Sequence, residues 1–172
     1  MATDKIELEI VTPKGLVLKA SVDEVTAPSV QGELGIMPGH LPVLLAVRTG
    51  VITYRMGTDL KKCAIGEGFA EGGPNKLVVL TEEFVDKDGV DPVAVRAELA
   101  EVEVKLEKAT QAADNEDASA TKQLISRENW LAAQLELIGD PPAPTMHPVD
   151  DDEDDDEDGV ILEADAGTSP ST

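Results

Sequence analysis

The sequence predicts a mixed fold, in which an N-terminal β-sandwich is followed by an antiparallel hairpin of two helices and by a disordered acidic tail. Three observations predict it. Hydrophobic residues alternate with polar ones in the first half of the chain, they recur every three or four residues after Asp88, and an unbroken acidic run follows at 150–158. We therefore divide the chain into a β-sandwich domain at 1–88, a helical hairpin at 89–140 and a tail at 141–172.

Short strands separated by turn residues account for the first region. In KIELEIVT, at 5–12, Ile6, Leu8 and Ile10 fall on one face, which is the period-two pattern of a half-buried strand. Further strands are predicted at 15–28, 41–47, 51–56, 62–70 and 77–84, with turns at 13–15, 57–59 and 72–75. Many short strands with frequent turns, and no helical period before Asp88, favour a sandwich or barrel.

One segment of this region, GELGIMPGHLPVL at 32–44, combines three glycines and two prolines with closely spaced hydrophobic residues. Gly and Pro at this density predict a turning loop. The interleaved Leu34, Ile36 and Met37 indicate that the loop packs against something. Because Pro38 and Pro42 restrict φ, we expect the loop to be stiff.

Two amphipathic helices are predicted after the strands. Asp91 is a good N-cap and Pro92 suits the first helical position, and Val95, Leu99, Val102 and Leu106 then form one apolar stripe. A second helix is expected at about 118–138, with Gly139 as its C-cap and one stripe made by Leu124, Leu131, Leu135 and Ile138. Two such helices joined by a short link should pair antiparallel, and they need a surface to lie on.

The charge distribution excludes some classes of partner. The net charge is −21, and residues 141–172 alone carry 11 Asp or Glu and no Lys or Arg. Such a chain is repelled by nucleic-acid phosphates and by anionic lipid, so we expect neither as a direct partner. No apolar run reaches the roughly 20 residues of a membrane-spanning helix, and MATDKIELEI is unlike a secretory signal. We expect a cytoplasmic protein that reaches a membrane only through protein partners.

No catalytic, cofactor-binding or metal-binding site is predicted. His40 has no nucleophile or metal ligand near it in the sequence, and a structural or interface role is expected. The single Cys63 precedes Ala64 and Ile65 and is expected to be a small buried residue. The glycines at 66–73 lack the phosphate-loop pattern and stand beside Glu67 and Glu71, so a hairpin turn is expected there.

The order of these motifs resembles that of one known family. GELGIMPGHLP at 32–42, Gly50-Val51-Ile52, GEGFAEGGPNKLVVLTEE at 66–83 and the two-helix region are similar to the epsilon subunit of F-type ATP synthases, over residues 4–139. The resemblance implies a non-catalytic subunit of the rotating central stalk, which couples the gamma subunit to the c ring in ion-driven ATP synthesis. It further implies peripheral attachment at the cytoplasmic side of the inner membrane.

The resemblance also implies which residues meet the partners. In this family the loop that matches 33–40 lies against gamma and the c subunits. The expected interface residues are Glu33, Leu34, Ile36, Met37, Pro38 and His40. Torque must cross this contact without slipping, so a stiff loop suits the task.

Two regulatory properties of the family are expected to be weak here. Some members bind ATP through Asp-x-x-Arg-Ala, whereas here four residues separate Asp91 from Arg96. Five positions apart, the two lie about 140° from each other around a helix, so ATP binding is doubtful. The hairpin of some members swings up to the beta subunit through basic residues and blocks ATP hydrolysis. This second helix offers only Lys122 and Arg127, and we expect it to stay folded down, with the acidic tail as a further bias.

One alternative of another class remains open at this point. A free-standing β-sandwich with an acidic tail could bind basic proteins, as a histone-like-protein chaperone does. Stable recovery with gamma would favour the stalk subunit, and recovery with basic proteins would favour the chaperone. An independent enzyme is rejected, because no nucleophile–base pair or set of metal ligands is present in the sequence.

Overall fold

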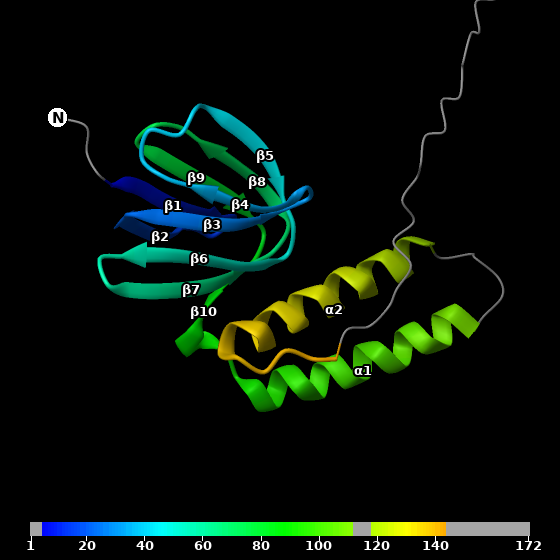
Figure 1. Ribbon diagram of the computed structural model, residues 1–172. Helices are drawn as coiled ribbons and strands as arrows, with labels where there is room; N and C mark the ends of the chain where they lie inside the picture. Colours follow the sequence, from blue (N-terminus) through cyan, green and yellow to red (C-terminus); the bar gives the residue numbers. More distant parts are fainter. Residues whose placement is uncertain (1–4, 112–117, 144–172) are drawn as a thin grey trace, which may run out of the picture.

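The computed structural model describes residues 5–111 and 118–143 and shows a β-sandwich followed by two helices (Figure 1). The predicted disorder of the tail lies outside the described residues, except at 141–143. The strands are β1 (Ile6–Thr12), β2 (Gly15–Val22), β3 (Glu24–Ser29), β4 (Gly32–Ile36), β5 (Val43–Val47), β6 (Gly50–Met56), β7 (Asp59–Ile65), β8 (Gly68–Gly72), β9 (Lys76–Thr81) and β10 (Phe84–Asp86). A 3₁₀ turn, η1 (Lys87–Gly89), leads to the helices α1 (Pro92–Gln111) and α2 (Ala118–Ile138).

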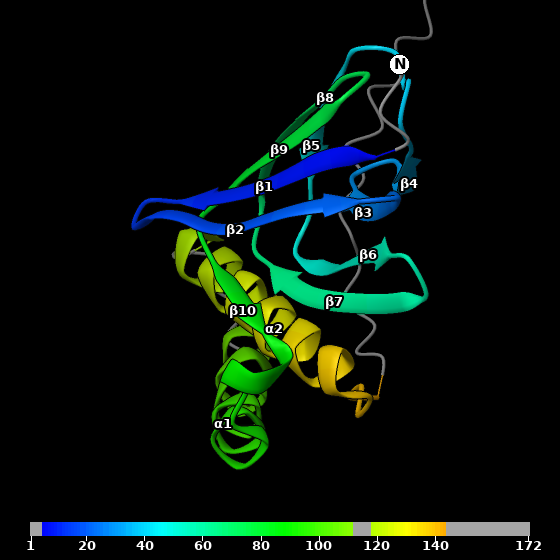
Figure 2. The same cartoon turned by 90° about the vertical axis from the view of Figure 1, so that its left-hand side faces the viewer.

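The strands form one continuous sheet that folds over itself into two layers (Figures 1 and 2). The strand order is β10-β7-β6-β3-β5-β8-β9-β1-β2, and β4 pairs with β3. As predicted, Ile6, Leu8 and Ile10 of β1 all point into the core, where none of them is exposed. The core between the layers holds aliphatic residues from most of the strands, together with Tyr54 and Cys63. The predicted fold class is confirmed.

Two predicted strands are each divided into two. The run at 15–28 breaks at Asp23, where the chain leaves its pairing with β1 and begins to pair with β4 and β6. The run at 62–70 breaks at Gly66 and Glu67, where the chain passes from β6 and β10 to β5 and β9. The period of two persists on both sides of each break, but its phase shifts by one residue, from Ala20 and Val22 to Val25 and Ala27 in the first run. In the second run the inward-facing positions shift from Cys63 and Ile65 to Ala70. The shift of phase marks a break in the strand, but it does not identify the new partner strand.

The loop predicted at 32–44 is a strand in its first part. Gly32–Ile36 pairs antiparallel with β3, in a register that places Ile36 opposite Val25 and Gly32 opposite Ser29. Gly32 has φ +113°, a left-handed conformation that makes the tight turn from β3 possible without strain. Here the glycine begins a hairpin strand, so the prediction of a loop is wrong for these five residues.

Both helices have the predicted bounds within a residue or so, and the stripe on α1 is buried as expected. The prediction of a single buried stripe on α2 is incomplete, because α2 has two buried faces. One face of α2 packs on α1 through Leu131 and Leu135. A second face, formed by Trp130, Ala133 and Leu137, packs on Ala64 of β7 with Val51 and Val85 at the edge of the contact. The hairpin was predicted to need a surface to lie on, and the sheet provides that surface. Helix α2 lies between the sheet and α1 (Figure 2).

Cys63 is buried, as predicted, and should be chemically inert in the folded chain. Its side chain is 1% exposed, and burial, reinforced by the charge of Asp86, raises the pKa of the thiol from 9.0 to about 12. Since the thiolate is the reactive form, we expect an aromatic disulfide reagent at pH 8 to react at least about 1000-fold more slowly with the folded than with the urea-unfolded chain. Similar rates in the two states would show that the thiol is accessible.

Candidate functional site

The six residues expected at the interface lie on β4 and the turn that follows it. Glu33 and Met37 are exposed, whereas Leu34, Pro38 and His40 are half-buried. Ile36 is 0% exposed and belongs to the core, so its expected role as contact surface is wrong. Side chains alternate between the two faces of β4, and residues three positions apart therefore lie on opposite faces. Glu33 points outward, so Ile36 points inward.

Hydrogen bonds fix the turn between β4 and β5. The amide of Gly39, which has φ +82°, donates to the Pro74 carbonyl over 2.7 Å, and the His40 amide donates to the Met37 carbonyl over 3.1 Å. The Nδ1 atom of His40 lies 2.7 Å from the Leu41 carbonyl oxygen. The turn lies at the end of the sandwich away from the helices (Figures 1 and 2). It therefore forms a braced tip that exposes Met37 and Leu41.

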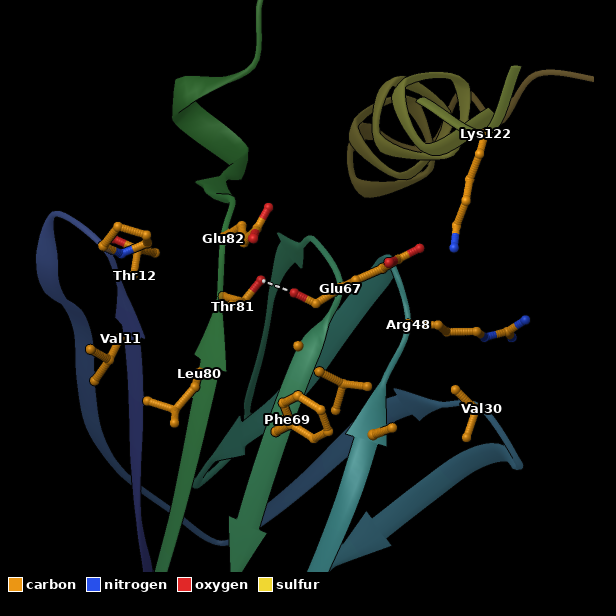
Figure 3. A pocket seen from close by; sticks show the side chains of 14 residues that line it. Val11, Thr12, Val30, Arg48, Glu67, Phe69, Leu80, Thr81, Glu82 and Lys122 are labelled. Carbon is orange, nitrogen blue, oxygen red and sulfur yellow. Dashed lines mark hydrogen bonds between the residues drawn. The ribbon is translucent and has the colours of Figure 1, made fainter. Parts of the chain in front are cut away.

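A row of hydrophobic side chains, some exposed and some half-buried, crosses four strands on the outer face of the sheet. The register places Val11 of β1 opposite Leu80 of β9, Leu80 opposite Phe69 of β8, and Phe69 opposite Ala46 of β5. Phe69 is 59% exposed and Leu80 is 52% exposed. Val30 adjoins the end of the row and is 68% exposed. We call Val11, Leu80, Phe69, Ala46 and Val30 the apolar row, and Figure 3 labels all of them except Ala46.

The apolar row lines an open hollow of about 800 Å³. Glu67, Glu82 and Arg48 lie around it, and Lys122 reaches toward it from the first turns of α2 (Figure 3). Val30 and Ala46 also line a second hollow of about 350 Å³, together with Glu33, Leu34 and Leu44. The apolar row and the strands that lead to the β4–β5 tip therefore form one continuous surface, which has the character of a protein-binding site.

Carboxylates accompany the apolar row. Glu67, Glu71 and Glu82 are exposed, and none of them has an ion pair within the part of the chain that the structure describes. By contrast, Lys19 and Lys76 both bind Glu9 nearby, and these hydrogen bonds lower the pKa of its carboxyl group to about 2. The unpaired carboxylates favour a partner that places cations around an apolar centre.

The residues of the apolar row are not among the interface residues predicted from the sequence. A signal was present in LVVL at 77–80, where Leu77 and Val79 fill the core. In a strand with one face in solvent, Val78 and Leu80 should be polar. Four consecutive hydrophobic residues thus predict that the outer face of this strand is hydrophobic as well as the inner one.

The structure does not bring Asp91 and Arg96 together as a nucleotide site. The Asp91 carboxylate caps α1, since its Oδ1 atom accepts hydrogen bonds from the amides of Val93 and Ala94 over 3.0 and 3.2 Å. The Arg96 guanidinium instead donates two hydrogen bonds to Asp140, just beyond α2. Each of the two residues is thus engaged within the hairpin, and the ATP site stays a doubtful expectation.

Replacing Asp91 with alanine should destabilise the start of α1. The loss of an N-cap of this kind costs about 1 kcal/mol, because two amides lose their acceptor. Hydrogen exchange of the amides at 93–95 should accelerate about fivefold. Asp88→Ala removes an exposed carboxylate that has no hydrogen bond in the described chain, and it should leave this exchange unchanged. Equal acceleration in both variants would contradict the assignment of the cap.

No set of three His, Cys, Asp or Glu residues suitable for a metal ion occurs within 5–111 and 118–143. Neither of the two helices, as far as the structure describes them, is long and apolar enough to cross a membrane.

Comparison with known proteins defines the class. The sequence model of the family "ATP synthase, Delta/Epsilon chain, beta-sandwich domain" matches residues 5–87, which is the part that carries the apolar row and the tip. The ATP synthase epsilon chain of Rhodospirillum rubrum is 36% identical over 129 residues, covering 74% of this chain and 95% of that protein. Epsilon chain 2 of Syntrophotalea carbinolica is 36% identical over 108 residues, covering 63% of this chain and 78% of that protein.

Two solved structures share the fold. A chain in the mitochondrial ATP synthase of Euglena gracilis, solved as OSCP/F1/c-ring, has a TM-score of 0.65 and 20% identity and covers 79% of this chain and 82% of that one. A chain of the central stalk and c ring of the Tetrahymena thermophila enzyme has a TM-score of 0.50 and 18% identity and covers 80% of this chain and 99% of that one. The chain belongs to the family of ATP synthase epsilon chains.

Proposed function

We propose that this chain is a non-catalytic rotor subunit of an F-type ATP synthase, which couples gamma to the c ring in ion-driven ATP synthesis. The observation that carries the proposal is the continuous exposed surface that runs from the apolar row to the β4–β5 tip in a member of the epsilon family. Monomeric soluble proteins rarely expose a contiguous row of hydrophobic side chains, so the exposed Phe, Leu and Val residues of this row favour a protein partner. Attachment to the cytoplasmic side of the inner membrane would be peripheral, through these partners.

The shape and chemistry of the two parts of the surface favour different partners. The apolar row lies across the side of the sheet, where a long stalk subunit could pack along it, and we assign it to gamma. The tip projects at the end of the sandwich, where a ring of polar loops could receive it, and we assign it to the c ring. Glu33, Met37 and His40 would make the contact, with Leu34 and Pro38 as its support.

The way in which the tip is held suits the transmission of torque. The tip continues directly into β4 and β5, and the hydrogen bond from Gly39 to Pro74 ties it to the β8–β9 turn. A tip braced from two sides moves with the sheet, so that a force applied at Met37 reaches the apolar row without loop deformation. Rigid strand-borne sites hold their geometry better than free loops do.

Regulation of ATP hydrolysis by the hairpin would be weak in this chain. The hairpin lies closed on β6 and β7, and Arg127, one of the two cations that could meet beta, is held by Glu98 of α1. A role of the tail in this bias remains a proposal that can be tested by hydrolysis rates of the assembled enzyme with and without residues 141–172. If both the rate and its salt dependence are unchanged, the tail has no such role.

Co-expression with the gamma subunit of the same organism tests the proposed function. We expect a complex that stays intact during size-exclusion chromatography in 0.15 M salt, and that then binds detergent-solubilised c ring. Recovery of the chain with basic cellular proteins instead, and no complex with gamma, would favour the chaperone and would contradict the proposal.

A further inference from the structure

The two helices of the hairpin differ in the number of neighbouring elements on which they pack. The outer helix, α1, packs on α2 through Val95, Leu99 and Leu106, and its buried stripe faces that helix. The inner helix, α2, has this contact and in addition the contact of Trp130 with the sheet. The described packing therefore attaches α1 to the β-sandwich mainly through α2. Separating α1 from the rest of the protein should thus require less free energy than separating α2.

Two arginines tie the helices together reciprocally. Arg96 of α1 donates from Nε and Nη2 to Asp140, which follows α2, and the Nε–Oδ2 distance is 2.9 Å. Arg127 of α2 donates from Nε to Oε1 of Glu98 on α1 over 2.7 Å. Each helix thus supplies a guanidinium group that is engaged by a carboxylate of the other segment. The hydrogen bond from Arg127 holds the pKa of the Glu98 carboxyl below its usual range.

The backbone at the end of α2 places Asp140 for this contact. Gly139 has φ +85°, its amide donates to the Glu136 carbonyl over 3.0 Å, and the Asp140 amide donates to the Leu135 carbonyl over 2.9 Å. These bonds form a glycine C-cap, which fixes the direction in which the chain leaves the helix. Arg127 is also placed from two sides, since its Nη1 lies 3.4 Å from Oε1 of Glu83 in the turn before β10.

We propose that α1 is a latched outer helix: the ties Arg96–Asp140 and Arg127–Glu98 hold it closed on α2, and ionic strength rather than a bound nucleotide sets how often it opens. In the closed hairpin both guanidinium groups are already engaged by carboxylates of this chain. Opening would expose the apolar stripes of α1 and α2 to a neighbouring subunit. The proposal concerns the isolated chain and does not depend on the assembly proposed above.

Hydrogen exchange of the full-length chain tests the latch. In 0.05 M salt, Asp140→Asn with Glu98→Gln should increase exchange at 95–106 of α1 about tenfold, because an exposed ion pair is worth a factor of roughly two to five. The increase should largely vanish in 1 M NaCl, where the ties of the natural chain are screened as well. Exchange at 130–137 of α2 and the emission of Trp130, the single tryptophan, should not change.

A control of equal charge separates the latch from general electrostatics. Glu101→Gln with Glu107→Gln removes two exposed carboxylates of the same helix that have no ion pair in the described residues, and α1 should then exchange as in the natural chain. The proposal is overturned if the control and the latch variant behave alike, or if the latch variant exchanges as the natural chain does. Protection of α1 in the natural chain by millimolar magnesium ATP would also overturn it.

Discussion

Replacing Phe69 with glutamate is expected to weaken the binding of gamma by at least about 100-fold while leaving the fold intact. Phe69 lies at the centre of the apolar row, between Leu80 and Ala46, and 59% of its surface is exposed. Central aromatic residues of interfaces typically contribute 2 kcal/mol or more, and a buried unpaired carboxylate beside Glu67 adds a further cost. Each 1.4 kcal/mol is a factor of ten in the dissociation constant.

Binding of the variant to gamma can be measured by calorimetry or by surface immobilisation, with the thermal unfolding temperature as a check of the fold. Leu60→Glu is the matched control, because Leu60 is 63% exposed but lies on β7, outside the apolar row. It should bind as the natural chain does. If both variants lose binding equally, or neither does, the apolar row is not the gamma contact.

Gly68→Ala should destabilise the β-sandwich by more than about 3 kcal/mol. An added Cβ atom would lie 1.9 Å from the Leu80 carbonyl oxygen and 2.9 Å from its carbon, both of which are backbone atoms of the neighbouring strand. Rotation of a side chain cannot relieve this clash, so β8 and β9 would have to separate. We expect the unfolding temperature to fall by about 10 °C or more. The same distortion would disturb the apolar row, to which both strands contribute.

Gly73→Ala provides the comparison for this variant. It lies in the turn after β8, and an added Cβ there would meet no atom within 4 Å. Its unfolding temperature should stay within about 2 °C of that of the natural chain, since surface changes of this kind are worth about 0.5 kcal/mol or less. An equal loss of stability in both variants would mean that chain flexibility, rather than the close approach at Gly68, determines the effect.

The order of strands and helices could be predicted because each signal is local. Ile6, Leu8 and Ile10 alternate because one face of β1 meets the core, and Asp91 begins α1 because its carboxylate reaches two free amides. The partners of the strands could not be predicted in this way. At Asp23 the chain changes from one neighbouring strand to others, and the phase of the hydrophobic alternation shifts by one residue, which marks the break but not the new partners.

The site was predicted only in part, since the sequence identifies a segment but not the direction of its side chains. Ile36 was expected at the interface and lies in the core, because β4 is a strand whose alternation turns that side chain inward. Phe69 and Leu80 were missed, because their adjacency depends on the pairing of β8 with β9. The second buried face of α2 was missed for a similar reason, since Trp130 is buried by residues that are distant in the sequence.

Cross-linking from the β4–β5 tip in native membranes tests the central claim most directly. Met37→Cys, treated with a maleimide photo-cross-linker, places the probe on a side chain that is 54% exposed, while the buried Cys63 should not be labelled. Val93→Cys on α1, at a position 76% exposed, is the control. We predict an adduct with the c subunit from position 37 and none from position 93, with loss of ATP synthesis on irradiation of the first alone. An adduct with c from position 93 and none from position 37 would contradict the account.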